Sequence, residues 1–134
     1  MAPTATALIG FATWLVLLTF ALAFFRVYVG TTTGKALNSF LPDGSDMPGL
    51  GRRLTRARDN CFETLPVFAA LAIGAQLSGR LDVTNGLAPW VLYTRVVQSV
   101  THIISTSVPA VLLRATMLVA QLLIYLYWGV HLLG

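Results

Sequence analysis

The sequence predicts an all-α integral membrane protein that forms a bundle of four transmembrane helices. Of its 134 residues, 56% are hydrophobic and only 10% are charged, whereas about a quarter of the residues in a soluble domain carry charge. The mean hydropathy of +0.74 agrees with this class. One helical crossing takes about 20 apolar residues. The chain therefore has room for four crossings in a single domain, residues 1–134.

Four apolar segments are the expected spans, at about residues 5–28, 60–78, 86–107 and 110–133. We expect helices, because a backbone in hydrocarbon must satisfy its own hydrogen bonds. None of the segments alternates apolar and polar residues as a membrane strand would. The first segment lacks a preceding basic region and is too long for a signal-peptide core, so we expect it to be retained. A stretch rich in Gly, Ser, Asp and Pro at about 30–52 predicts the one long loop.

The basic residues predict an orientation in the membrane. Arg80 stands alone at one end of the expected bundle. Most of the other basic residues flank the long loop or the last turn at the opposite end: Arg26, Lys35, Arg52, Arg53, Arg56, Arg58 and Arg114. The positive-inside rule then places the long loop in the cytosol and both termini outside. This topology explains the net charge of +4, so we expect no nucleic-acid partner. The short tails favour a bacterial inner membrane over the endoplasmic reticulum.

Three polar side chains open the second expected span, in the stretch RARDNCFETLPVF (56–68). Arg56, Asn60 and Glu63 stand at i, i+4 and i+7, which puts them on one helix face over about 10 Å of axis. Glu63 is the one acidic residue clearly inside an expected span. An unpaired carboxylate is costly in hydrocarbon. We therefore expect Glu63 to pair inside the bundle, with Arg95 of the third span as its candidate partner.

The third and fourth spans carry further polar residues toward the same end. Arg95, Gln98 and His102 follow one another at i, i+3 and i+7, so they share a face that we expect to point into the bundle. Arg114 stands near the cytosolic start of the fourth span, with Gln121 one heptad further on. Polar side chains from three helices are thus expected to converge in the cytosolic half of the bundle, which favours a ligand pocket there.

Each of these residues also has a purely structural interpretation. Arginines at helix ends often only mark topology and extend to the interface, and amides often join helices by hydrogen bonds. A Glu63–Arg95 pair could be structural, and His102 could be packed and satisfied. Cys61 is the sole cysteine, so we expect a small apolar packing residue rather than a disulfide. Co-location on one cytosolic face favours the pocket over these separate explanations.

At these residues the sequence resembles a known family, the membrane-associated proteins in eicosanoid and glutathione metabolism (MAPEG). The stretch RARDNCFETLPVF resembles the family's second-helix signature of Arg-Ala, then Asn, then Glu, then Pro and Phe. The resemblance extends over essentially the whole chain. It includes four spans in about this length, a long first cytosolic loop, and the stretch TRVVQSVTH followed by Arg114. Two departures stand out: His102 replaces a common tyrosine, and the interval from Arg95 to Arg114 is several residues longer than in familiar members.

The resemblance implies a homotrimer, in membrane lipid, that binds glutathione as a co-substrate in cytosol-facing clefts between neighbouring subunits, without a metal ion. Arg114 would be the catalytic residue, because a fixed cation in a dry site stabilises the glutathione thiolate. A hydrophobic small molecule would arrive from the bilayer and react with that thiolate. By position, the glutathione-binding residues would be Arg26, Arg56, Asn60, Glu63, Arg95, Gln98 and His102.

Three functions are compatible with these observations. The first is a membrane-bound glutathione-dependent transferase or peroxidase that acts on lipophilic electrophiles. The second is a non-catalytic member of the same family that binds lipid or serves as a scaffold, since a fold does not establish an activity. The third is a small proton-coupled multidrug exporter that uses Glu63. An exporter would be expected to carry a free carboxylate in its first helix, whereas Glu63 lies in the second, beside Asn60 and arginines.

Overall fold

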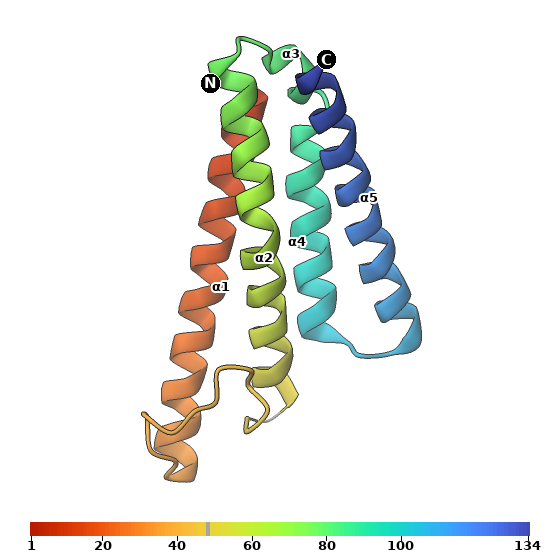
Figure 1. Cartoon of the computed structure of the whole chain (residues 1–134). Coiled ribbons are helices and arrows are strands. Elements are labelled where there is room, and N and C mark those ends of the chain that lie inside the picture. Colours follow the sequence, from red (N-terminus) through yellow and green to blue (C-terminus); the bar gives the residue numbers. More distant parts are fainter. Residues whose placement is uncertain (48) are drawn as a thin grey trace.

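The chain is all-helical in its computed structural model, which describes residues 1–47 and 49–134. This described part contains no strand, and it folds into four long helices with one short helix at the end where both termini lie (Figure 1). The predicted all-α class is therefore confirmed. In chain order the helices are α1 (Pro3–Thr33), α2 (Gly49–Leu77), α3 (Leu81–Thr84), α4 (Ala88–Ile104) and α5 (Val108–Leu133).

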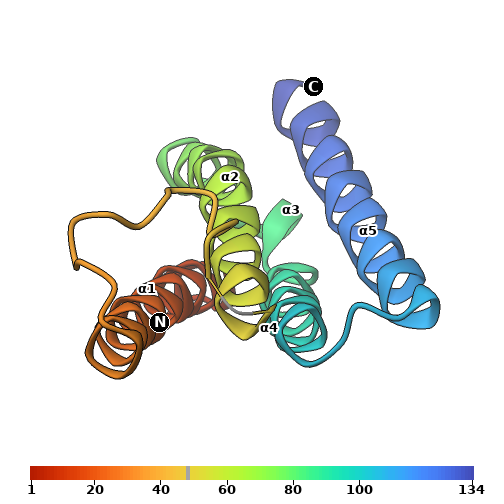
Figure 2. The same ribbon diagram turned by 90° about the horizontal axis from the view of Figure 1, so that it is seen from below.

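Three of these helices, α1, α2 and α5, are long and apolar enough to cross a membrane. The fourth long helix, α4, has only 17 residues, fewer than the roughly 20 of a full crossing. It is shorter than the expected span of 86–107 because it starts beside Pro89 and ends where Ser105 adopts extended backbone with ψ 147°. Figure 2 shows α4 beside α2, with these two helices between α1 and α5.

The connection between α1 and α2 is shorter than the predicted loop of about 30–52, because both helices extend into it; residue 48 lies outside the described residues. α1 continues through three threonines whose hydroxyls donate to carbonyls one turn back. It ends at Gly34, whose φ of 75° is a left-handed conformation that glycine adopts readily. At the other side, α2 already begins at Gly49, and Arg53 Nε donates to the Ile103 carbonyl oxygen of α4 at 2.7 Å.

The loop itself has a fixed shape around one acidic side chain. Lys35 Nζ lies 3.0 Å from Asp46 Oδ2, and the Leu41 backbone N–H donates to the same carboxylate. Met47 is buried under α2. The loop therefore closes against the ends of both helices, next to the candidate site.

The core is an aromatic layer between α1, α2 and α5. Phe68 of α2 lies 5.6 Å from Phe11, 6.1 Å from Tyr125 and 5.8 Å from Trp128, measured between ring centroids. All four side chains are buried. Such pairs add to apolar burial by about 0.5–1.5 kcal/mol each in favourable geometry. This layer fixes which face of α2 points inward, and that orientation decides where the candidate site residues of α2 point.

Candidate functional site

Arg56, Asn60 and Glu63 form the first group of candidate residues, which we call the α2 row. All three lie within α2, so the spacing i, i+4, i+7 does put them on one helix face. Arg56 and Glu63 are exposed, and Asn60 is half-buried. Within the described residues, no hydrogen bond or ion pair uses any of these three side chains. The single chain thus presents a free cation, a free amide and a free carboxylate side by side.

The orientation of the α2 row follows from the residues between its members. Cys61 is fully buried, with Sγ 3.2 Å from Ser99 Oγ of α4. Its expected role as a packing residue is confirmed. Two residues along an α-helix correspond to a turn of about 200°, so Glu63 must point away from the core that Cys61 faces. The α2 row is consequently on the outside of the single bundle.

Arg95 does not pair with Glu63, and this expectation from the sequence is wrong. Arg95 is fully buried, its Nη2 donates to Gln121 Oε1 of α5, and its guanidinium carbon lies 5.5 Å from the centre of the Phe11 ring. Glu63 and Arg95 can lie at similar depths along the bundle, but the Glu63 side chain is on the side of α2 that points away from the core. Depth alone therefore did not identify the partner.

Gln121 is the residue that joins α5 to α4. Its Nε2 lies within hydrogen-bond distance of Thr94 Oγ1 (3.1 Å) and Gln98 Oε1 (3.2 Å), and its Oε1 accepts from Arg95. We call these residues the α4–α5 hub: Thr94, Arg95, Gln98 and Gln121. The sequence already placed Gln121 one heptad after Arg114. It did not identify Thr94 as a hydrogen-bond partner, because a threonine in a helix usually bonds its own backbone.

The face shared by Arg95, Gln98 and His102 does point into the bundle, as the spacing predicts. All three side chains are buried, at 0%, 2% and 9% exposure. His102 lies in the last turn of α4, near the end that leads into α5. Its Nδ1 has no hydrogen-bond partner among the described residues. His102 is therefore a buried polar side chain of this face that keeps an unused ring nitrogen.

Arg26 and Arg114 complete the predicted set, but one chain does not bring them together. Arg26 belongs to α1 and Arg114 to α5, and these helices lie on opposite sides of α2 and α4 (Figure 2). Both side chains are half-buried, and the Nε of each is buried without a partner among the described residues. In the single chain, the two arginines therefore belong to helices on different sides of the bundle.

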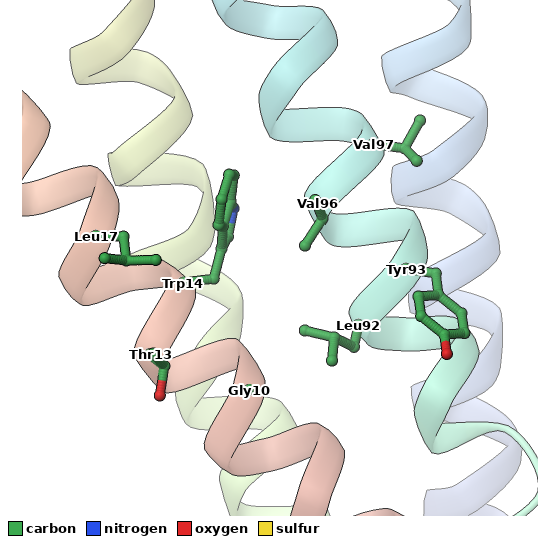
Figure 3. Close-up of a pocket in the computed structure, with 8 residues that line it drawn as sticks. All are labelled: Gly10, Thr13, Trp14, Leu17, Leu92, Tyr93, Val96 and Val97. Carbon is green, nitrogen blue, oxygen red and sulfur yellow. The ribbon is translucent and has the colours of Figure 1, made fainter.

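Apolar pockets lie on the surface between the helices. One of about 520 Å³ is bounded by Trp14 and Leu17 of α1 and by Leu92 and Val96 of α4, and Figure 3 shows Trp14 and Leu92 extending into the space between the two helices. Gly10 also borders it and lies close to Leu92, since a Cβ there would come 2.8 Å from Leu92 Cδ2. Within the described residues, no group of three or more His, Cys, Asp or Glu side chains gathers as metal ligands.

The fold and the site together define an integral membrane protein. It is a small helical bundle with apolar surfaces that also carries a set of polar candidate binding residues. The chain belongs to the MAPEG family, whose model matches residues 4–134, essentially the whole sequence. The resemblance noted in the α2 stretch is thereby confirmed at the level of the family. Comparison with curated proteins and with solved structures gives no significant match. The MAPEG family includes membrane glutathione transferases and peroxidases.

Proposed function

We propose that this protein is a membrane-bound glutathione-dependent transferase or peroxidase. The observation that carries the proposal is the α2 row, in which Arg56, Asn60 and Glu63 are all unpaired among the described residues. Glutathione has two carboxylates, one ammonium group and two peptide bonds. The guanidinium suits a carboxylate, the Glu63 carboxylate suits the ammonium, and the amide suits a peptide group. The row's length of about 10 Å matches an extended tripeptide.

The proposed assembly is a homotrimer, the state that the family resemblance implies. A free Glu63 carboxylate on the outside of a membrane bundle would be costly against lipid, so a neighbouring subunit that covers the α2 row removes that cost. The same neighbour can bring a second arginine to the site, because Arg26 and Arg114 are on opposite sides of one chain. We place the site at the subunit boundary for these two reasons.

The proposed topology has four crossings, with α4 as the short fourth one. Its polar residues are buried, while its exposed positions include Trp90, Tyr93, Val97 and Ile104, which suits a helix that contacts lipid. The long loop and its basic flanks then face the cytosol, and both termini lie outside. A bacterial inner membrane is the favoured location.

Arg114 is the proposed catalytic residue. The thiolate, and not the thiol, is the nucleophile, and a nearby fixed cation in a water-poor site favours the ionised sulfur. In conjugation the thiol proton leaves to solvent, the sulfur forms a bond to an electrophilic carbon, and the leaving group departs with the electron pair of the broken bond. The lipophilic electrophile enters from the bilayer through the apolar surface of the bundle.

Glutathione titration of the purified protein in detergent tests the proposal. Saturable binding with a thiolate absorbance band is expected in the wild type, and Arg114→Ala is expected to keep binding but lose the band. Arg56→Ala is expected to lose the binding itself. Binding that is unaffected by both substitutions would contradict the proposed site.

A second function, a non-catalytic family member that binds lipid or acts as a scaffold, is favoured by one observation. Arg95 and Gln98 of α4 both form hydrogen bonds with Gln121 of α5 inside the bundle, so two of the predicted glutathione ligands already have a structural task. Glutathione binding without a thiolate band in the wild type at a pH of about 6.5, where an unperturbed thiol is almost wholly protonated, would support this second function.

A further inference from the structure

Two hydrogen bonds made by α2 side chains connect α2 to α4 within the described residues. Cys61 Sγ lies 3.2 Å from Ser99 Oγ, and Arg53 Nε donates to the Ile103 carbonyl oxygen at 2.7 Å. Residues 53 and 61 stand about 12 Å apart along the axis of α2, at 1.5 Å per residue. The first two members of the α2 row lie between these two contacts. Arg53 therefore fixes the α2–α4 contact at the end of this segment that Cys61 does not reach.

The carbonyl that Arg53 binds belongs to the last turn of α4. The last four carbonyls of a helix lack an intrahelical donor, and among those of α4 the Thr101 carbonyl already accepts from the Ser105 N–H. Arg53 supplies a donor to Ile103, whose side chain packs against the core. A guanidinium also suits the negative end of the helix dipole, and a charge-assisted bond is stronger than a neutral one. The end of α4 is thus held against the start of α2 by one arginine.

The first turn of α2 distinguishes Arg53 from the arginine next to it. Arg53 is half-buried, and a Cβ at Gly49 would come 3.1 Å from its Nη1, so the glycine leaves room for the guanidinium. Arg52 is exposed, and within residues 1–47 and 49–134 its side chain makes no hydrogen bond or ion pair. Two neighbouring cations therefore differ in one respect that can be tested, which is the bond to α4.

The end of α4 leads into α5 through a short turn with hydrogen bonds of its own. Ser105 Oγ donates to Ser107 Oγ at 3.0 Å, and the Ser107 N–H donates back to Ser105 Oγ. Ser107 Oγ accepts from the Ala110 N–H in the first turn of α5. Arg114 follows about 10 Å along that helix. Figures 1 and 2 show that the start of α5 is connected to α4 and stands apart from α2. The position of Arg114 relative to α2 therefore depends on the end of α4.

We propose that Arg53 is a positioning residue for the glutathione chemistry: it holds the end of α4, and through the α4–α5 turn Arg114, at a fixed place relative to the α2 row. This inference rests on the proposed function, because it gives Arg53 a task in the reaction assigned to Arg114. Arg53 acts through the Ile103 carbonyl and not on glutathione. Stabilisation of a thiolate by a fixed cation depends strongly on placement, whereas binding by the α2 row depends on α2 itself. Loss of Arg53 should therefore impair thiolate formation more than binding.

Arg53→Met in the full chain, purified in detergent, tests this role. Methionine keeps an unbranched apolar stem but donates no hydrogen bond. Glutathione is titrated at a series of pH values while the thiolate absorbance is recorded. We expect the dissociation constant to change by less than about twofold, whereas the apparent pKa of the bound thiol should rise by about one unit, a tenfold loss of thiolate below that pKa. Arg53→Lys keeps a cation and a donor and should recover most of the loss.

The matched control is Arg52→Met, which removes the neighbouring charge and should behave as the wild type. Arg53→Gln, a polar variant with a shorter side chain, should give the same result as Arg53→Met, so the test stands if the methionine variant does not fold. Hydrogen exchange followed by mass spectrometry reports on the contact itself without glutathione. Amides of residues 104–110 should exchange about tenfold faster without Arg53, the factor that one hydrogen bond provides.

A raised thiol pKa together with faster exchange of the α4–α5 turn supports the proposal. Unchanged exchange overturns it, and so does faster exchange with an unchanged thiol pKa, which would leave Arg53 a purely structural residue. Equal effects of Arg52→Met would also overturn it, because charge alone would then explain the result. A wild type that forms no thiolate overturns the proposed function itself, and this failure is recognisable because it occurs with Arg53 intact.

Discussion

The buried α4–α5 hub and the exposed α2 row contain the same kinds of side chain in opposite environments. In the hub, Arg95 donates one hydrogen bond to Gln121 between two helices, and the guanidinium lies beside the Phe11 ring. In the row, Arg56 and Glu63 have no ion-pair partner within residues 1–47 and 49–134. We propose from this comparison that an arginine in a membrane helix serves folding when it is buried and paired, and binding when it is left unpaired. Substitutions in the hub should therefore change stability, and substitutions in the row should change ligand affinity.

The largest expected effect is from Arg95→Ala. It leaves Gln121 Oε1 unsatisfied in the core and opens a space beside Phe11, so we expect the free energy of unfolding to fall by about 3 kcal/mol. Thermal unfolding in detergent measures this. The double variant Arg95→Met with Gln121→Leu removes both partners and should recover most of the loss, because paired polar groups can often be replaced by apolar groups at little cost. A stable Arg95→Ala protein that has lost glutathione binding would reverse the assignment of the hub.

Glu63→Gln should give the opposite result. The substitution removes the charge that is proposed to hold the ammonium group of glutathione, so the dissociation constant should rise by about tenfold or more. Stability should change by no more than about 0.5 kcal/mol, as for other exposed positions. Calorimetric titration and a thermal scan on the same sample give both numbers. A large loss of stability together with unchanged affinity would mean that Glu63 has a structural partner.

Gly51→Ala tests a third region, the contact between the start of α2 and the loop. A Cβ at Gly51 would lie 2.7 Å from Phe25 Cε1 and 2.9 Å from Met47 Cβ, so overpacking should cost about 1–2 kcal/mol. Gly10→Ala is the matched control, since its Cβ would meet only the mobile end of the Leu92 side chain. Thermal unfolding should show a clear loss for the first and little change for the second. Equal losses of stability in the two variants would contradict the expectation that packing is tighter at Gly51 than at Gly10.

The smallest expected effect is on the loop, at low pH. The hydrogen bond from Lys35 holds the pKa of Asp46 below its ordinary value, and the Leu41 N–H acts in the same direction. A carboxyl group with a lowered pKa stabilises the loop at pH values above its unfolded pKa, and this contribution is lost as the pH falls through the folded pKa. Proteolysis or hydrogen exchange of residues 34–47 should therefore speed up below the usual range of an aspartate. Asp46→Asn should show no such pH dependence.

Composition and spacing alone determined the class and much of the local geometry. The sequence predicted the all-α class and the apolar segments from hydropathy. It also predicted the common face of Arg56, Asn60 and Glu63 and the burial of Cys61, because these features depend on the helical repeat and on hydropathy along a single helix. The helix ends were less predictable. α2 begins well before its apolar part, since the basic residues near Arg53 can remain helical outside the hydrocarbon.

Only the tertiary structure decided which polar side chains meet. The sequence placed Glu63 and Arg95 at similar depths, but the rotation of α2 about its own axis, set by packing of Cys61 and Phe68 in the core, turned Glu63 outward. Arg95 consequently met Gln121, a residue on a different helix. A sequence specifies positions along each helix, whereas the relative rotation of helices results from the packing of all their side chains together, and pairing depends on that rotation.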